Sequence, residues 1–379
     1  MLKNKIYNHI INEILKNFIT ILLTFTAIAW TVRAVNFLDL MIEDGFSAGI
    51  YFKYSLLNIS TIITRFIPLS FLLALTITIA KFERQKELLI LWTAGLSKIK
   101  ITYVLFGVAF FIALVQIFLS LIINPFALNK SRSILRDTDT KQVNSILKSN
   151  DFSDTFKGVT FYIEKKNSND ELINIFIKDR NGSLNTLVSE AEGSKNTTII
   201  AKRGFVERKK LILFEGIIQT LNKKNEIKNV NFEKTELSMG SFTTRTIVKP
   251  KVQETSSYKL FQCLLNTDTS IIIQNCSLTD NKKSATEALA RRLGMPLYIP
   301  LISVITSFLL IYKKKKKYNF LRKYIIFVFG FLVLIFAEII LKYTGFSLLN
   351  FSLYFFLPLV LFLMLYLILL KKLIYERIT

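Results

Sequence analysis

Histidine and cysteine are almost absent from this 379-residue chain, which contains one histidine, His9, and two cysteines. A single histidine excludes a zinc site built on histidine pairs and a Ser-His-Asp catalytic triad. No two of its glycines lie five residues apart, so the phosphate-binding loop G-x-x-x-x-G-K-[ST] is missing as well. We therefore predict no cofactor, no metal site and no ATPase site in this chain. An enzyme site made of carboxylates alone stays open.

Hydrophobic sequence is what the chain has in excess. Apolar residues make up 51% of the chain, and 33 residues are phenylalanine. A helix needs about 20 mostly apolar residues to cross a bilayer. On this basis we predict six transmembrane helices, at residues 17–38, 56–80, 101–125, 293–312, 324–342 and 351–370. The first helix follows a 16-residue polar head and has no small-x-small cleavage site before Asp39, which favours a retained helix over a signal peptide.

The positive charge of the chain is concentrated at one predicted membrane face. Segments 1–16, 81–100, 313–323 and 371–379 together hold 18 basic and four acidic residues. By the positive-inside rule this distribution places these segments and both termini in the cytoplasm. Residues 126–290 then lie on the other side of the membrane. A net charge of +23 is also typical of nucleic-acid binding, but a charge distributed in this way gives no reason to expect a nucleic-acid partner.

The segment between the third and fourth predicted helices has the pattern of antiparallel strands. Apolar and polar residues alternate there, as in a half-buried strand, and the Asn181–Gly182 pair is typical of a tight hairpin. The predicted inner face comprises Val159, Phe161, Ile163, Ile173, Ile175 and Ile177. This face is either the core of a small β-domain or an apolar surface that receives lipid.

The two cysteines, Cys263 and Cys276, both lie in the part of the chain predicted to be exported, where disulfides are permitted. The sequence leaves open whether they form a bridge or remain two free thiols.

A short amphipathic segment, "KFERQKELLILWTAGLSKIKI", separates the second and third predicted helices. Leu88, Leu91, Trp92 and Gly95 follow the i, i+3, i+4, i+7 spacing of one helical face. Glu87 lies beside this face, and Gly95 can adopt the left-handed conformation that ends a helix. We predict a cytoplasmic helix at residues 83–95. It is either an interfacial helix anchored by Trp92 or a helix that docks onto a cytoplasmic partner.

Four arginines fall within or beside the predicted membrane spans: Arg33, Arg65, Arg291 and Arg292. At 1.5 Å per residue, Arg33 and Arg65 lie about 24–26 Å from the predicted cytoplasmic edge. A charge inside a membrane span is costly and usually faces a cavity or a partner. These arginines are therefore candidate ligands for an anionic substrate; snorkelling to the headgroups, or pairing with Glu338, is the alternative.

Several motifs resemble those of the LptF/LptG (YjgP/YjgQ) permease family of the lipopolysaccharide ABC exporter. The similar segments are "KELLILWTAGLSK", "IPLSFLLAL", "GVTFYIEKK" with "LINIFIKD", and "ATEALARRLGMPLYIPLI". Their order along the chain also matches, with three spans, a β-domain and three further spans. "WTVRAVNF", which contains Arg33, and "NTDT" are more similar to LptF than to LptG.

The resemblance implies a polytopic α-helical membrane protein with an inserted periplasmic antiparallel β-jelly roll. The implied parts are residues 1–129 with the coupling helix, 130–286 with the jelly roll and flanking helical segments, and 287–379 with the last three spans. Such a permease sits in the bacterial inner membrane and extracts lipopolysaccharide from its outer leaflet. The implied partners are a paralogous permease, a cytoplasmic ABC ATPase dimer and a periplasmic bridge protein with a β-jelly-roll fold.

In this interpretation Glu87, Leu88, Leu91, Trp92 and Gly95 form the coupling surface for the ATPase, the four arginines bind substrate phosphates, and the inner β face receives acyl chains. Alternatives are the LptG-type role in the same complex, a membrane sensor or scaffold with a periplasmic β-domain, and an integral-membrane hydrolase or transferase.

Overall fold

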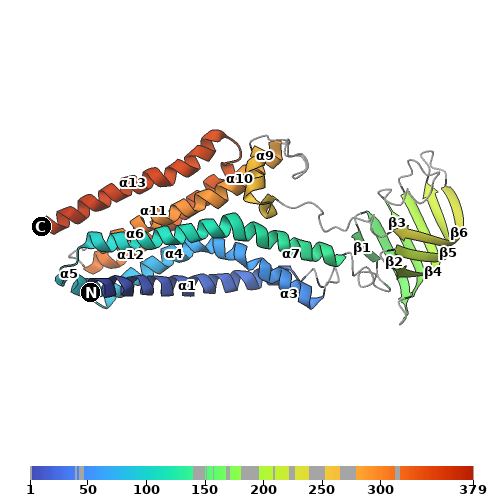
Figure 1. Cartoon of the computed structure of the whole chain (residues 1–379), viewed down its shortest axis with the longest axis horizontal. Helices are drawn as coiled ribbons and strands as arrows, with labels where there is room; N and C mark the ends of the chain where they lie inside the picture. The colour runs from blue at the N-terminus through green and yellow to red at the C-terminus, as the bar shows by residue number, and fades with distance from the viewer. Residues whose placement is uncertain are drawn as a thin grey trace. The chain divides into compact units, whose positions relative to one another are not determined.

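The computed structural model describes residues 2–38, 41, 47–139, 150, 152–156, 158–167, 171–180, 196–207, 210–221, 227–238, 252–264, 279–311 and 316–378. The chain folds into two compact units (Figure 1). The first comprises Met1–Arg33, Leu57–Asn129 and Lys251–Thr379, and the second comprises Ala34–Leu56 and Lys130–Pro250.

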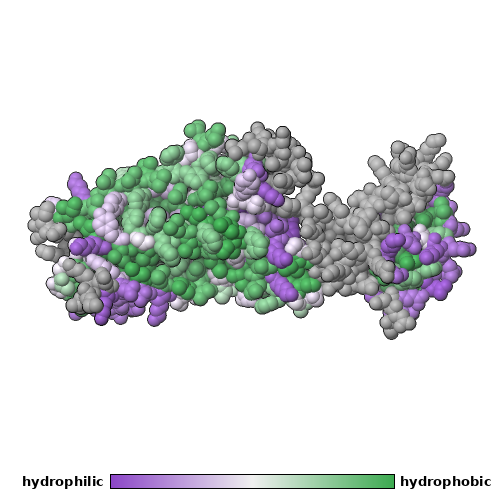
Figure 2. Space-filling model, in the orientation of Figure 1, coloured by the Kyte–Doolittle hydropathy of each residue, from purple (hydrophilic) through white to green (hydrophobic). Residues whose placement is uncertain are grey.

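Six helical stretches in the described part of the chain are long and apolar enough to cross a membrane. They are Lys5–Asn36, Ala48–Arg84, Lys98–Leu135, Lys282–Leu310, Leu321–Tyr343 and Leu348–Tyr375. The six predicted spans are thereby confirmed. Figure 2 shows hydrophobic side chains over the middle of the visible face of the helical unit, with hydrophilic side chains towards its two ends. This banding is typical of a surface that contacts lipid.

The helices before the sheet are α1 (Leu2–Asn36), α3 (Ala48–Leu57), α4 (Ile59–Arg84), α5 (Glu87–Thr93), α6 (Lys98–Phe118), the π-helix η1 (Leu119–Ile123) and α7 (Asn124–Asp139). The helices after it are η4 (Val252–Glu254), α9 (Ser257–Leu264), α10 (Thr279–Gly294), η5 (Met295–Leu297), α11 (Tyr298–Ser307), η6 (Phe308–Leu310), α12 (Lys316–Tyr343) and α13 (Leu348–Ile378).

Helix α11 forms the centre of the helical unit and packs against α4, α6, α12 and α13. Nine of its ten residues are buried. Its hydroxyl side chains cost little to bury because they bind carbonyls of their own helix: Thr306 Oγ1 donates to Ile302 O at 3.0 Å and Ser307 Oγ donates to Ser303 O at 2.6 Å. Small hydroxyl residues also let neighbouring helices approach closely.

A close approach joins the C-terminal end of α10 to α13. A Cβ added at Gly294 would lie 2.2 Å from Cε1 of Tyr354, a residue with no exposed surface. Glycine is therefore required here for packing. The contact fixes the end of α10, where Arg291 and Arg292 lie.

The second unit contains a six-stranded antiparallel sheet whose strands follow one another in sequence order. The strands are β1 (Phe152–Phe156), β2 (Val159–Lys166), β3 (Leu172–Asp179), β4 (Asn196–Glu207), β5 (Lys210–Leu221) and β6 (Ile227–Ser238). The inserted antiparallel β-domain is thereby confirmed. The described strands form one meander, and the two packed sheets of a jelly roll are not seen among them. The predicted Asn181–Gly182 hairpin lies outside the described residues.

The alternation predicted for β3 is interrupted at Asn174, which has a left-handed backbone with φ of 51°. Ile175 and Ile177 are buried as predicted, whereas Ile173 is only half-buried and Leu172 occupies the core instead. The positive φ of Asn174 reverses the side-chain alternation at this point, while the pairing of β3 with β2 and β4 keeps one continuous register. The prediction that Ile173 shares this face is therefore wrong.

Cys263, on α9, is disulfide-bonded and buried against Leu260, Ala285 and Leu289. Cys276, the other cysteine of the chain, lies outside the described residues. Of the two alternatives, bridge or free thiol, the bridge is the one present at Cys263.

Candidate functional site

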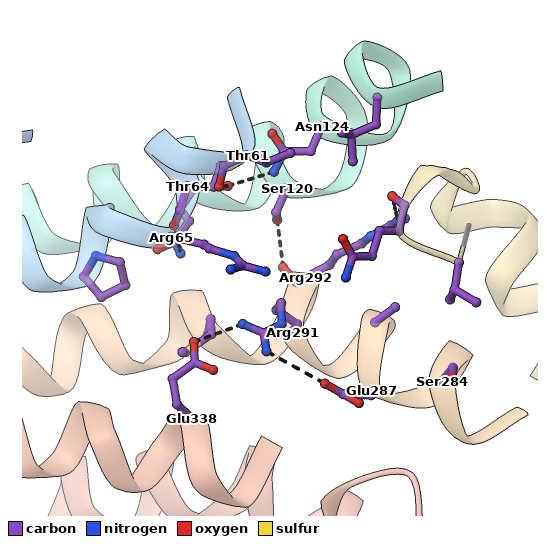
Figure 3. Close-up of a pocket in the computed structure, with 17 residues that line it drawn as sticks. Thr61, Thr64, Arg65, Ser120, Asn124, Ser284, Glu287, Arg291, Arg292 and Glu338 are labelled. Carbon is purple, nitrogen blue, oxygen red and sulfur yellow. Dashed lines mark hydrogen bonds and ion pairs between the residues drawn. The ribbon is translucent and has the colours of Figure 1, made fainter. Parts of the chain in front are cut away.

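A polar cavity of about 440 Å³ lies within the helical unit, between α4, the π-helix η1 with its neighbouring turns, and α10 (Figure 3). Its polar lining residues are Thr61, Thr64, Arg65, Gln116, Ser120, Asn124, Gln253, Ser284, Glu287, Arg291, Arg292 and Glu338. The π-helix contributes directly, because Ser120 Oγ donates to the carbonyl of Arg292 at 2.8 Å. π-Helices are rare and are often found at functional sites.

Arg291 and Arg292 are both engaged by other protein groups. Arg291 lies 3.0 Å from Glu338 and 3.8 Å from Glu287, measured between guanidinium nitrogen and carboxylate oxygen. Arg292 is only 7% exposed and donates to Ser257 Oγ at 2.8 Å and to the carbonyls of Gln253 and Thr255 at 2.9 Å. Arg292 thus ties α10 to the segment that begins at η4.

Arg33 and Arg65 are less constrained. Arg33 donates one hydrogen bond, to Thr61 Oγ1 at 3.3 Å. Arg65 makes no hydrogen bond or close ion pair with any described residue, and Figure 3 shows its guanidinium pointing into the cavity. Arg65 is within electrostatic range of Arg291, Arg33 and Glu338. The fold therefore brings the predicted arginines into one region and leaves Arg65 available for an anion.

The sequence analysis did not identify Gln116 and Asn124, two amide side chains that line this cavity. Gln116 Nε2 donates to the carbonyl of Thr64 at 3.2 Å, and Asn124 Nδ2 donates to Thr64 Oγ1 at 2.8 Å. The oxygens Gln116 Oε1 and Asn124 Oδ1 are buried and have no hydrogen-bond partner among the residues that the structure describes. One sequence signal could have identified both residues, because Gln116 and Asn124 are the amides inside the third predicted span, where polar residues are often functional.

At the opposite end of α4, helix α5 is shorter than predicted. Helix α4 continues to Arg84, and α5 extends only from Glu87 to Thr93. Lys86 has a left-handed φ of 61°, which separates the two helices. The predicted bounds of 83–95 are therefore wrong at the N-terminal side, because Glu83 belongs to α4 and pairs with Lys323 at 3.0 Å.

The C-terminal end of α5 has the predicted glycine stop. Gly95 has a φ of 77°. The amide of Leu96 donates to the carbonyl of Leu91 at 3.1 Å and the amide of Gly95 to that of Trp92 at 3.0 Å, which is the Schellman arrangement. Ser97 occupies the next N-cap position, but its side chain makes no capping hydrogen bond.

The apolar face predicted for α5 is directed into the helical unit. Leu88 is buried, and Leu91 and Trp92 pack against the main core cluster. The outward apolar side chains are Leu89, which is 55% exposed, and Ile90, which is 62% exposed. The residues at i, i+3 and i+4 therefore form the buried face of α5, as such a pattern usually indicates in a globular protein.

Glu87 lies at the edge of this outward surface, beside the N-terminal helix. Its carboxylate is 3.7 Å from Nε2 of His9. A groove of about 290 Å³ runs between α1 and α5 and is lined by Lys5, Ile6, His9, Ile10, Phe82, Glu87, Ile90 and Leu91.

The predicted inner face of the sheet is closely packed. Val159, Phe161, Ile163, Ile175 and Ile177 are each at most 2% exposed and belong to one cluster with residues of β4, β5 and β6. In this structure the face is therefore a packed core and is not open to a ligand.

These features define a polytopic membrane protein with an inserted β-domain, an arginine-lined cavity within its helices and a short helix that connects two spans. Residues 8–372 match the family model of the lipopolysaccharide export system permease LptF/LptG, and the chain belongs to this family. The match does not distinguish LptF from LptG.

One curated relative is RP871, an uncharacterized protein of Rickettsia prowazekii (strain Madrid E), which is 24% identical over 189 residues. The aligned part covers 50% of this chain and 52% of RP871. The match thus spans about half the length of that relative.

Proposed function

We propose that this protein is a permease subunit that exports lipopolysaccharide from the outer leaflet of the bacterial inner membrane. The family match over nearly the whole chain supports this function, since it includes both sets of three spans and the β-domain between them. Residues 1–129 and 287–379 form the membrane part, and residues 130–286 form a periplasmic domain. Both termini face the cytoplasm.

The observation that carries the proposal is the construction of α5. Leu88, Leu91 and Trp92 hold the helix against the membrane core, which leaves Leu89, Ile90 and Glu87 towards the outside. An isolated helix of seven residues is not stable in water, so packing must keep it folded. A firmly held helix with an outward apolar patch and an acid is suited to transmit force from a cytoplasmic ABC ATPase dimer.

At the other end of α4, Arg65 and Arg33 are the proposed ligands for substrate phosphates. Among the described residues, the guanidinium of Arg65 has no hydrogen-bond partner, and Arg33 would give up one long hydrogen bond to a hydroxyl group. Arginine binds phosphate well because its planar donors match the phosphate oxygens. Arg291 and Arg292 act differently in this proposal, since they hold the cavity together through Glu338 and the η4 segment.

The β-domain is the proposed acceptor of acyl chains, which it would transfer to a periplasmic bridge protein with a jelly-roll fold. The five buried residues of the predicted face supply an apolar surface of the right kind. Because they are packed together, acyl chains must displace this packing in order to enter. We also propose a heterodimer with a paralogous permease, and an LptF-type role for this chain.

A pull-down of the tagged, full-length chain in mild detergent tests the proposal. The wild type should retain a cytoplasmic ATPase and a second six-span protein. Glu87→Lys and the double variant Leu89→Ser/Ile90→Ser should lose the ATPase while keeping the membrane partner. Ile374→Ser serves as the matched control, since Ile374 is an exposed apolar residue on α13. If the wild type brings down no ATPase although it is folded in the membrane, the exporter function is wrong and a sensor role is favoured.

A further inference from the structure

The polar cavity continues into an apolar groove on the helical unit. Arg65, Pro68, Met295 and Glu338 line both spaces. The groove, of about 310 Å³, is otherwise lined by Leu69, Phe331, Leu334, Ile335, Ile339 and Lys342, which belong to α4 and α12. A polar cavity joined to an apolar groove matches an amphiphile, with a headgroup in the first space and a hydrocarbon chain in the second. Cavities of about 300–1,000 Å³ are typical of small-molecule sites.

The orientation of the two amides follows from their partners. The carbonyl of Thr64 can only accept a hydrogen bond, so Gln116 must present its Nε2 to it. The hydroxyl of Thr64 shares its one proton between the carbonyls of Ser60 and Thr61, so its oxygen accepts from Asn124 Nδ2. Gln116 Oε1 and Asn124 Oδ1 therefore remain acceptors without a donor. Gln116 is only 3% exposed, and a buried polar atom without a partner is costly.

The charges around the cavity are arranged with opposite signs on opposite sides. Arg65 provides one positive charge with no close carboxylate among the described residues. Arg291 pairs with both Glu287 and Glu338, so these three side chains together carry one net negative charge. The positive charge of Arg292 is directed away, towards Ser257 and two backbone carbonyls. The cavity thus offers a donor for an anion at Arg65, neutral acceptors on the two amides held by the neighbouring Thr64, and negative charge at Glu287 and Glu338.

From these three observations we propose that the cavity binds the zwitterionic headgroup of a lipid, a phosphate ester that carries a primary ammonium group. The phosphate binds Arg65, the ammonium donates to the amide oxygens and to the carboxylates, and one acyl chain lies in the groove between α4 and α12. This inference rests on the proposed function for the assignment of Arg65 to a phosphate. It adds a site for the ammonium group of the same headgroup. The lipid is either a phospholipid of the membrane or an ammonium-bearing form of the exported glycolipid.

Native mass spectrometry of the full-length chain tests this proposal with two probes. Phosphatidylethanolamine carries ammonium donors, whereas phosphatidylcholine has the same phosphate but no N–H group. We expect the chain to retain phosphatidylethanolamine about tenfold better, as the loss of one charged hydrogen bond implies. Arg65→Gln should weaken retention of both lipids. Gln116→Met should remove the preference for phosphatidylethanolamine, and Gln116→Glu should increase it. Arg84→Gln, at the far end of α4, is the matched control and should bind both lipids as the wild type does.

Two results would overturn the inference: equal retention of the two lipids by the wild type, or unchanged retention by Arg65→Gln. Photocrosslinking of lipopolysaccharide to the same variants distinguishes a failure of the zwitterion site from a failure of the proposed export function. If Arg65→Gln lowers crosslinking while the wild type does not discriminate between the phospholipids, the export function stands and the zwitterion site is wrong. Once discrimination is seen, added lipopolysaccharide identifies the source of the headgroup: displacement of phosphatidylethanolamine indicates the exported glycolipid, and its retention indicates a membrane phospholipid.

Discussion

Helix α4 connects two regions of very different character. Near its start, Arg65 faces a cavity in which charges lie among the helices, and near its end Glu83 pairs with Lys323 beside the short helix α5. The two residues are about 27 Å apart along the helix. At the cavity end polar groups are turned inwards, whereas at the α5 end apolar groups are turned outwards. Polar groups are costly to bury within the membrane, and apolar groups are costly to expose to water. Each arrangement is therefore typical of a binding site, for a ligand in the cavity and for a partner protein at α5.

The largest expected effect concerns the stability of the cavity end. Arg292→Ala should lower the free energy of unfolding by about 3 kcal/mol, because it removes a buried charged donor that bonds three acceptors of the η4–α9 segment. Thermal unfolding in detergent measures this change. Arg65→Ala is the control and should have little effect, since Arg65 holds no described residue in place. A similar loss of stability in both variants would contradict the distinction between Arg292, which stabilises the fold, and Arg65, which is available for a ligand.

The α5 end should show the opposite relation between stability and function. Leu89→Ala/Ile90→Ala should leave the melting temperature nearly unchanged, because both side chains are exposed. The same change should weaken binding to the ATPase about tenfold, as expected for truncation of two interface residues. Leu88→Ala should lower the melting temperature because Leu88 is buried. An unchanged affinity for the ATPase in the double variant would contradict the outward face as the docking surface.

In the β-domain the two faces of the sheet can be compared directly. A photocrosslinking residue at Phe161, on the buried face, should capture lipopolysaccharide during export. The same residue at Ile200, which is 53% exposed, should capture several-fold less. Mass spectrometry of the crosslinked product gives the ratio. Stronger capture at Ile200 would show that the lipid passes over the outer face.

The smallest expected effect is a pH dependence at Glu215, on the exposed part of β5. A hydrogen bond from Lys202, followed by one from Arg203, holds the pKa of Glu215 below its ordinary value. A lowered pKa in the folded state means that this contribution is present above the ordinary pKa and is lost as pH falls through the lowered value. Glu215→Gln should therefore slightly lower the melting temperature at pH 7. At a pH well below the ordinary value the wild type and the variant should melt alike, since the pair is exposed and weak.

Much of the fold follows from one-dimensional patterns. Runs of apolar residues predict the six spans because a bilayer requires a fixed helix length, and alternation predicts the strands because side chains point to opposite faces of a sheet. The failures are local. Asn174 adopts a positive φ, which moves Leu172 into the core in place of Ile173. Lys86 also adopts a positive φ, and this conformation separates α4 from α5. Neither asparagine nor lysine at these positions predicts the positive φ from the sequence.

The sequence by itself determined the membrane class, the place of the β-domain, the glycine that ends α5 and the arginines that lie in or beside the cavity. Each of these depends on local composition or on spacing along one element. Only the tertiary structure decided which arginine is available, which face of α5 is outward and which amides lack a donor. These properties depend on partners far apart in the sequence, such as Arg291 with Glu338 and Gln116 with Thr64. A side chain is occupied or available only after its neighbours have been brought to it by packing.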